Sequence, residues 1–483
     1  MRCAFVLLAA CLGALVGAAA GQEGVRLSPR DLADQIVAEI PPLEVARGER
    51  LPLIVWRLQN VRSEDEEDLE RLLTALNERG VATVSRWAMR NFDQVRDQAL
   101  RTAAVQQKVG MPVVVNATGA MYRFFDGSKA TAHVDADGEK FFDGSFSERV
   151  AIGCPFAVEH RFPAIRSQME AFVEAYAEAG LPLDIVIGDW EIDGPIEWND
   201  AWENSRKCVR CRENIPNIDN FGEFQAALRV VRSRMQRECF VEPVKRRYPD
   251  ALVGNYAVYP HGGLRYWYDY FEREASDEMP FVSEQRARYR PWFHEFSLCG
   301  YSMAMPVVYT WRRIYDWYDF DNRDYRWFYN MLLVASNAGW STGPEIPIVS
   351  FVHWHTTAPG GLPPVPQFSA ENYRELIWHM LLRGHDGLAL WCRVEETLAE
   401  TQLLHEVYAA SLEHMEFLEE GTPVAFDAPR QPGPVVSGLR LGERVLVRRT
   451  EFDDSPDPVV LPVDDRLLVV PRAPGETQIL ELE

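Results

Sequence analysis

The chain reads Leu183-Asp-Ile-Val-Ile-Gly-Asp189-Trp-Glu191-Ile-Asp193-Gly194 at its most informative point, an apolar run that ends in three acidic residues spaced two apart. Side chains alternate faces along a β-strand, so Asp189, Glu191 and Asp193 would project from one face, each about 7 Å from the next. The apolar part is long enough for a buried parallel strand. Carboxylates that are buried together disfavour one another's charged form, and a strand tolerates such a cluster at its open end. We interpret the triplet as catalytic; a solvated strand end with ordinary surface acids is the alternative.

Short apolar segments alternate with amphipathic helices along most of the chain. The predicted strands are 51–58, 81–87, 111–118, 183–192, 251–259, 301–311, 346–354 and 387–392. The predicted helices are 64–79, 92–108, 162–179, 221–247, 325–338, 370–383 and 395–420, and several are followed by a glycine. Eight strands that alternate with helices are typical of a closed barrel, because a doubly wound open sheet rarely needs so many. We predict an α/β fold, a (β/α)8 TIM barrel.

Four segments make up the predicted organisation. Residues 1–20 are a signal peptide, 21–50 an N-terminal lead-in, 51–420 the catalytic barrel and 421–483 a small antiparallel β-domain, where Pro-rich linkers separate short alternating strands. Residues 122–161 and 195–220 are interpreted as insertions after strands. Loops at the carboxyl ends of barrel strands build the active face, so long insertions there indicate a walled cleft for an extended substrate.

The first twenty residues predict export to the periplasm or the extracellular space. Arg2 precedes an apolar run over residues 4–20 that ends in Ala18-Ala19-Ala20, small residues that suit a signal peptidase. A lipoprotein modified at Cys11 is the alternative. No later segment reaches 18 unbroken apolar residues, so we expect no membrane span in the mature chain.

The composition indicates a globular protein and argues against one class of binding partner. The chain has 483 residues, of which 47% are hydrophobic and 25% charged, and a formal net charge of -22. Nucleic acid is disfavoured as a partner because phosphates would be repelled. Neither a serine nucleophile elbow nor a phosphate-binding glycine loop occurs in a suitable context, and we predict no cofactor.

Six cysteines remain after the predicted signal peptide, too few for a disulfide scaffold. Cys208-Val-Arg-Cys211 favours a local disulfide, whereas paired free thiols and a zinc knuckle with two further ligands stay open. We predict no metal in the active site.

The ends of the predicted strands are rich in aromatic and polar side chains, which suits sugar rings because these offer C–H faces to stack on and hydroxyls to hydrogen-bond. The candidate substrate-binding residues are Trp56, Trp87, Asn116, Trp190, Asp193, Tyr256, Tyr259, Trp311, His353, His355 and Trp391. The two histidines could instead bind a metal with a nearby carboxylate. We predict an oligosaccharide or polysaccharide as substrate.

Four short motifs resemble those of the hyaluronidase and chitinase barrels. These are Asp189-Trp190-Glu191 at the end of an Ile/Val strand, Tyr256-Ala-Val-Tyr259-Pro260, Met305-Pro306-Val-Val-Tyr309 and Leu390-Trp391, in family order. The chain departs from the family after its Glu, where Ile192-Asp193 replaces an acid and a Trp.

The resemblance implies a glycoside hydrolase that cleaves a glycan bearing a 2-acetamido sugar by a substrate-assisted, retaining mechanism. Glu191 would be the general acid and base, Asp189 would orient the acetamido group, and Tyr309 would hydrogen-bond it. Two alternatives stay open. One is a two-carboxylate retaining glycosidase that uses Asp269, Glu295 or Glu197 as its second carboxylate, and the other is a non-catalytic carbohydrate-binding barrel.

Overall fold

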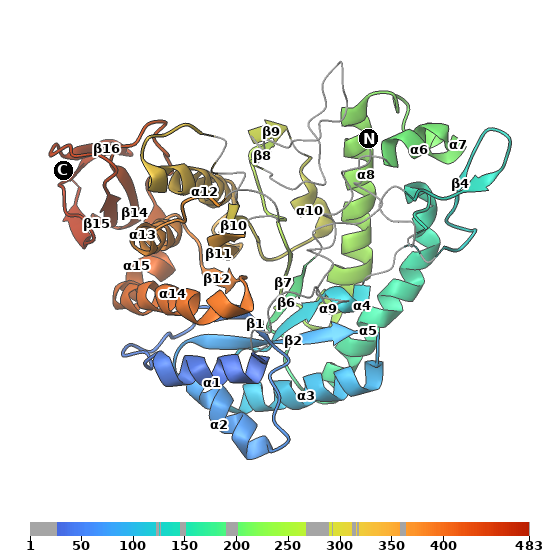
Figure 1. Ribbon diagram of the computed structural model, residues 1–483, viewed down its shortest axis with the longest axis horizontal. Helices are drawn as coiled ribbons and strands as arrows, with labels where there is room; N and C mark the ends of the chain where they lie inside the picture. The colour runs from blue at the N-terminus through green and yellow to red at the C-terminus, as the bar shows by residue number, and fades with distance from the viewer. Residues whose placement is uncertain are drawn as a thin grey trace.

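A computed structural model describes residues 27–121, 125, 127–144, 151–189, 201–266, 289–291, 293–311, 315, 318–357 and 364–482. Its central feature is one parallel sheet of eight strands in the order β10-β11-β12-β1-β2-β3-β6-β7 (Figure 1). The strands are β1 Leu53–Gln59, β2 Val81–Ala88, β3 Val114–Ala117, β6 Ile185–Gly188, β7 Leu252–Asn255, β10 Val307–Trp311, β11 Val349–Thr357 and β12 Gly387–Leu390. Each corresponds to one predicted strand.

The residues that lead into β10 close this sheet into a barrel. Ser302 donates its backbone N–H to the Val253 carbonyl at 3.0 Å, and Met305 donates to the Val258 carbonyl at 2.9 Å. Gly254 permits this approach, because a Cβ there would lie 2.8 Å from the Met303 carbonyl oxygen. The predicted α/β fold, a (β/α)8 TIM barrel, is confirmed.

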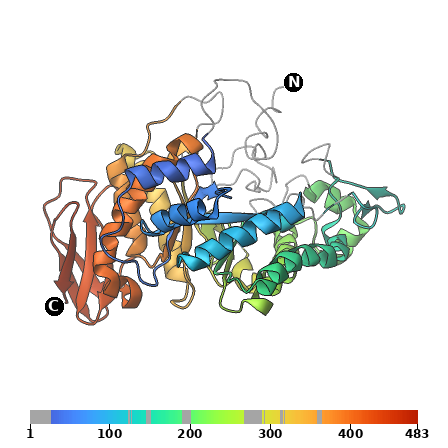
Figure 2. The same cartoon turned by 90° about the horizontal axis from the view of Figure 1, so that it is seen from below.

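Helices follow the strands and cover the outside of the barrel (Figure 2). The principal ones are α2 Glu66–Asn77, α3 Phe92–Lys108, α5 Phe162–Glu178, α8 Phe221–Gln236, α9 Glu242–Arg247, α12 Arg323–Ser341, α13 Ala370–Leu381, α14 Thr397–Ser411 and α15 Met415–Glu420. A π-turn, Arg237–Val241, joins α8 to α9, so the single predicted helix 221–247 is nearly continuous. The apolar faces expected from the sequence are buried, as Leu69, Leu72, Leu73 and Leu76 of α2 show.

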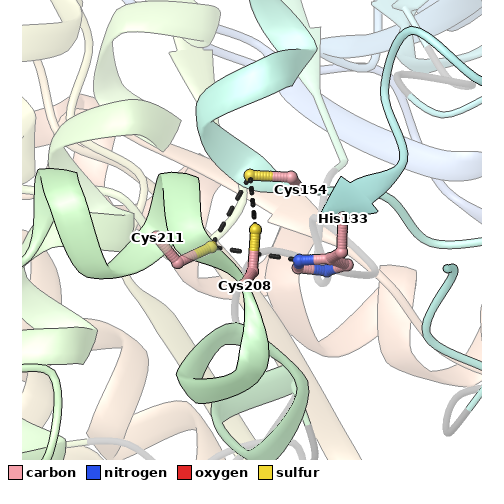
Figure 3. A group of neighbouring side chains, drawn as sticks. All are labelled: His133, Cys154, Cys208 and Cys211. Atoms are coloured by element: carbon pink, nitrogen blue, oxygen red, sulfur yellow. Dashed lines mark hydrogen bonds between the residues drawn. The ribbon is translucent and has the colours of Figure 1, made fainter. Parts of the chain in front are cut away.

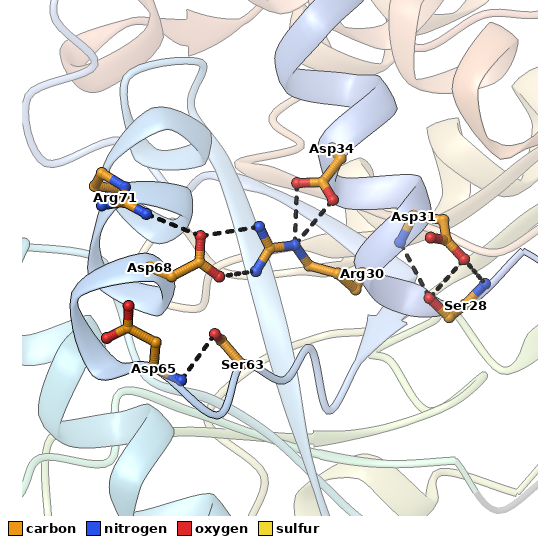
Figure 4. Close-up of polar contacts among 8 residues, drawn as sticks. All are labelled: Ser28, Arg30, Asp31, Asp34, Ser63, Asp65, Asp68 and Arg71. Carbon is orange, nitrogen blue, oxygen red and sulfur yellow. Dashed lines mark hydrogen bonds and ion pairs between the residues drawn. The ribbon is translucent and has the colours of Figure 1, made fainter.

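An additional helix, α1 (Pro29–Glu39), lies in the predicted lead-in and had no predicted counterpart. Ser28 caps it, since its hydroxyl accepts from the Asp31 N–H while the Asp31 carboxylate accepts from Ser28. Arg30 lies between Asp34 of the same helix and Asp68 of α2 (Figure 4). The buried Leu32, Ala33 and Ile36 dock α1 onto the barrel core.

Shorter elements lie in and beside the two predicted insertions. The helix α4 Thr118–Met121 directly precedes the first, which holds the hairpin β4 His133–Val134 with β5 Lys140–Phe141 and the 3-10 helix η2 Pro155–Arg161; the second holds α6 Ala201–Lys207 and α7 Val209–Asn214. Further small elements are the hairpin β8 Leu264–Tyr266 with β9 Tyr289–Pro291, α10 Glu295–Cys299, η4 Val394–Glu396 and η5 Leu412–His414.

The C-terminal strands form a four-stranded and a two-stranded antiparallel sheet, and the four-stranded sheet contacts α13. Their bounds are β13 Thr422–Pro423, β14 Val435–Leu441, β15 Arg444–Thr450, β16 Val459–Val463, β17 Arg466–Val470 and β18 Thr477–Glu481. They lie at one end of the molecule, and β4, α6 and α7 lie at the opposite end (Figures 1 and 2). Across the described ranges, no helix combines the length and the apolar character that crossing a bilayer requires.

Candidate active site at the carboxyl ends of the strands

Asp189 follows directly after β6, where the sequence predicts the catalytic acids. Its backbone N–H donates to the Thr118 hydroxyl at 2.7 Å, which fixes the strand end against the residues that follow β3. The side chain is half-buried, and desolvation raises the pKa of the Asp189 carboxyl to about 6, although the positive charge of Arg86 acts in the opposite direction. Trp190, Glu191 and Asp193 lie outside the described residues.

A chain of hydrogen bonds runs along the rim from β1 to β6. Asn116 donates its side-chain amide to the Gln59 side-chain oxygen at 3.2 Å, and its own Oδ1 accepts from the Thr118 N–H at 3.0 Å. Thr118 in turn holds Asp189. Asn116 is therefore at the rim as predicted, and it positions the residues that support the acid.

An aromatic cluster occupies the opposite side of the barrel interior. The Tyr309 and Trp391 rings stack at 5.7 Å with an interplanar angle of 21°, and the His353 ring meets both edge-on, at 5.9 and 5.7 Å. Tyr256 lies 6.3 Å from Tyr309. Trp391 is only half-buried, so it is the member of this cluster with a surface to offer to a ligand.

Three other aromatic residues that were predicted to bind substrate lie outside this cluster. Trp56 is buried and packs edge-on against Phe351 at 5.4 Å. Trp311 is the last residue of β10, and its side chain lies outside the described part of the chain. Tyr259 is buried in the core cluster that also holds Trp87.

The prediction that Trp87 forms part of a sugar-binding surface is wrong. Its side chain is completely buried, and its ring stacks on Phe172 of α5 at 4.9 Å with an interplanar angle of 6°. Alternation along β2 turns Trp87 toward the covering helices and Arg86 toward the opposite face. Trp87 is therefore a packing residue.

His353 is held by a buried carboxylate that sequence reasoning missed. Its Nδ1 lies 3.4 Å from Oε2 of Glu400 in α14, and Oε1 of Glu400 accepts from the Tyr373 hydroxyl at 2.8 Å. Nε2 of His353 is buried and has no hydrogen-bond partner among the residues that the structure describes. With a proton on Nδ1 directed at Glu400, Nε2 is left as a hydrogen-bond acceptor.

His355 has a carboxylate neighbour of its own. Nδ1 of His355 lies 3.8 Å from Oε1 of Glu396, which follows β12, and burial lowers the pKa of His355. Oε2 of Glu396 is buried, and none of the described residues hydrogen-bonds to it. The sequence carried a signal for this residue, because Glu396 stands five residues after the predicted strand-end Trp391.

Glu295 does not suit the role of a second catalytic carboxylate. It is buried in α10 beside Arg232 of α8, with 3.9 Å between the Arg232 Nε and a carboxylate oxygen, and both side chains are 2% exposed. Such a pair is closed to a substrate. The other two candidates, Glu197 and Asp269, lie outside the described residues.

Four side chains with metal-binding atoms meet away from the barrel rim (Figure 3). His133, Cys154, Cys208 and Cys211 are all buried. The local disulfide favoured from the Cys208-Val-Arg-Cys211 spacing is wrong, because both residues are free thiols. Within the described residues, this is the group whose donor atoms converge as those of a metal site do.

The protein is thus a (β/α)8 barrel that carries an acidic residue and an aromatic cluster at the carboxyl ends of its strands. The sequence matches no family model and no curated protein. Among solved structures it is similar to a GH36 α-galactosidase from Geobacillus stearothermophilus (TM-score 0.45, 10% identity, 94% of this chain and 58% of that chain).

Two further solved structures give similar values. One is α-L-fucosidase isoenzyme 2 from Paenibacillus thiaminolyticus (TM-score 0.43, 10% identity, 78% of this chain and 51% of that chain). The other is an isomaltulose synthase from Protaminobacter rubrum (TM-score 0.42, 10% identity, 90% and 99%). The chain spans little more than half the length of the galactosidase and the fucosidase.

Proposed function

We propose that the protein is an exported glycoside hydrolase that cleaves a glycan containing a 2-acetamido sugar by a substrate-assisted, retaining mechanism. The observation that carries the proposal is the position of Asp189 at the carboxyl end of β6, half-buried and with its pKa raised to about 6. Active sites of such barrels lie at this end of the strands, and acids with a raised pKa concentrate in them.

Asp189 and Glu191 would divide the chemistry between them. Residues two apart on an extended strand share a face, so Glu191 would reach the same side of the barrel as Asp189. Glu191 would protonate the leaving oxygen, and Asp189 would orient the acetamido group as its carbonyl oxygen attacks the anomeric carbon. The substrate then supplies the nucleophile itself, and no second enzymic nucleophile is required.

The aromatic cluster supplies complementary contacts. Trp391 would stack on the sugar ring, with Tyr309 hydrogen-bonding the acetamido group, and Nε2 of His353 would accept a hydrogen bond from a sugar hydroxyl. Glu400 holds the His353 ring in place for this contact.

The experiment is a hydrolysis screen of the purified chain against amino-sugar polymers and glycan conjugates. Glu191→Gln and Asp189→Asn should each lower kcat/KM by at least about 100-fold, the range that loss of a general acid or an electrostatic group produces. Glu178→Gln, an exposed acid at the end of α5, is the matched control and should behave as the wild type. Undiminished turnover in Glu191→Gln would refute the mechanism.

A thiazoline that mimics the cyclised acetamido intermediate separates the two hydrolytic mechanisms. It should inhibit a substrate-assisted enzyme competitively and leave a two-carboxylate enzyme unaffected. The two-carboxylate mechanism is the second candidate because Glu396, beside His355, has a carboxylate oxygen with no hydrogen-bond partner in the described part of the chain. In that case Glu396→Ala would abolish turnover and added azide would restore it.

A carbohydrate-binding barrel without activity is distinguished by the same variant. Glu191→Gln would then retain the affinity of the wild type for glycans, and neither protein would release reducing ends.

The proposal that the protein is exported depends on residues 1–20, and the mature protein is expected to begin at Gly21.

A further inference from the structure

A buried cluster of three cysteines and one histidine joins the two insertions (Figure 3). His133 belongs to β4 and Cys154 precedes η2, both in the insertion that follows β3. Cys208 precedes α7 and Cys211 lies within it, in the insertion that follows β6. Segments that are separated by more than fifty residues thus bring their donor atoms together, which the sequence spacing alone does not show.

Three of the donor–donor distances within the cluster are close to those around a single tetrahedral ion. The Cys154 sulfur lies 3.5 Å from that of Cys211 and 3.8 Å from that of Cys208. The Cys211 sulfur lies 3.9 Å from Nδ1 of His133. Zinc bonds of about 2.3 Å to sulfur and about 2.0 Å to nitrogen, at tetrahedral angles, place the donor atoms about 3.5 to 3.8 Å apart. We propose that His133, Cys154, Cys208 and Cys211 bind one Zn²⁺ ion.

The four donors define a structural site. All four donor atoms lie within 4.8 Å of one another, so the protein fills the whole tetrahedron and leaves no position for a substrate or a catalytic water. Three thiolates and an imidazole are soft and borderline ligands of the kind that select Zn²⁺ over the oxygen-seeking Mg²⁺ and Ca²⁺. The Cys-x-x-Cys pair at a turn into a short helix is the spacing that zinc knuckles use.

A disulfide accounts less well for this geometry. A covalent sulfur–sulfur bond is about 2.0 Å long, whereas the Cys154 sulfur lies 3.5 Å from that of Cys211 and 3.8 Å from that of Cys208, and all three cysteines are free. Any one disulfide among the three cysteines would also leave a thiol and the histidine without a role. An ion uses all four.

The surrounding backbone is built to hold the donors in place. Cys154 donates its N–H to the Thr131 carbonyl at 2.7 Å, and the neighbouring Gly153 lies so close that a Cβ would be 2.1 Å from the same oxygen. The His133 ring stacks on Phe141 at 5.0 Å, which sets its orientation. Arg210, which stands between Cys208 and Cys211 in the sequence, donates to the Ala132 carbonyl at 3.3 Å.

The ion would fasten the two insertions to each other. The second insertion begins six residues after Asp189, so the zinc tetrahedron would anchor the segment that follows the acidic strand end. The inference concerns the fold of the insertions and stands independently of the proposed activity, since its readouts are metal content and spectra.

The test measures zinc in the full chain, produced without a histidine tag. We expect about one zinc per chain by plasma mass spectrometry in the wild type, and less than about a tenth of that in Cys208→Ser or Cys211→Ser. Cys239→Ser is the matched control, because Cys239 is an equally buried thiol outside the cluster, and it should retain the full zinc content.

Two measurements remain decisive if a serine variant fails to fold. Cobalt exchanged into the wild type should give the sulfur-to-cobalt charge-transfer and visible bands of a tetrahedral thiolate site, and Cys208→His, which keeps a donor, should keep the zinc. Wild-type protein without metal and with a Cys154–Cys211 disulfide would overturn the proposal. So would iron in place of zinc, or zinc that persists in Cys208→Ser.

Discussion

Nδ1 of His353 lies 3.4 Å from Oε2 of Glu400, and both side chains are almost completely buried. Burial raises the pKa of Glu400, and hydrogen bonds from His353 and Tyr373 oppose that rise by favouring the carboxylate. The carboxylate therefore holds the Nδ1 proton and orients the imidazole. Nε2 is left as the acceptor beside Tyr309 and Trp391, so Glu400 is a positioning residue for the aromatic side of the site.

Replacing Glu400 should disturb that orientation. In Glu400→Gln we expect kcat/KM to fall about 10- to 100-fold, mostly through KM, because the Nε2 acceptor would no longer be fixed toward a sugar hydroxyl. Nitrogen NMR should show the wild-type His353 as the Nδ1–H tautomer and the variant as a mixture. Tyr373→Phe is the control, since it removes a hydrogen bond to Glu400 and keeps the charge. An unchanged tautomer in Glu400→Gln would contradict the assignment.

Asp189 should make the wild type less stable as the pH rises. Its pKa in the folded protein is raised to about 6 from the ordinary 3.8, so the folded state binds the proton more tightly than the unfolded state. The free energy of unfolding therefore falls between about pH 4 and pH 6 and stays lower above that range.

Asp189→Asn removes this pH dependence. We expect the variant to be more stable than the wild type at pH 8 by about 1 to 3 kcal/mol, with the difference shrinking toward pH 4. Thermal melts across this range measure it, with Glu178→Gln as the control acid. A difference that is constant with pH, or largest at pH 4, would show that Asp189 is ordinarily ionised in the folded protein.

The barrel was predictable because a parallel strand buried on both faces leaves a continuous apolar run, as Ile185–Gly188 does. The acid at its end was predictable for the same reason, since the run stops at Asp189. Trp87 was misjudged because an aromatic residue at a strand end can face either side. The neighbouring Arg86 could have indicated the direction of Trp87, because side chains alternate along a strand and only one of the two can point toward the barrel interior.

The cluster of three cysteines and one histidine, and the role of Glu400, could not be predicted from the sequence for a different reason. Cys208 and Cys211 are visible as a pair, but His133 and Cys154 join them only through the packing of two insertions. Glu400 is similar, because it meets His353 across the gap between a strand and a later helix. Local spacing records which residues share an element, and it does not record which elements meet.

The C-terminal sheets are attached to the barrel through a buried ion pair. Arg448 of β15 donates to Glu375 of α13, both side chains are 9% exposed, and the Thr450 hydroxyl donates to the same carboxylate. Arg448→Met would leave that carboxylate buried without its cation, and we expect a loss of about 3 to 5 kcal/mol in the free energy of unfolding.

Urea denaturation measures this loss, and β15 provides a matched control. Arg444 pairs with Glu416 at the surface, so Arg444→Met should cost less than about 1 kcal/mol. The double variant Arg448→Met/Glu375→Leu should recover most of the lost stability, because no unpaired charge remains. Equal costs for Arg448→Met and Arg444→Met would mean that the ion pair is not shielded from water.

Gly153 is the residue on which the approach of Cys154 to His133 depends. A Cβ at position 153 would lie 2.1 Å from the Thr131 carbonyl oxygen, so Gly153→Ala must push the two segments apart and separate the donor atoms. We expect the melting temperature to fall by several degrees and a chromogenic chelator to remove the bound metal at least about tenfold faster. Gly144→Ala tests the same insertion without a clash, since no atom of the described residues lies within 4 Å of its Cβ, and it should match the wild type in both measurements. Identical chelation rates for the two alanine variants would show that the spacing of these segments does not control the site.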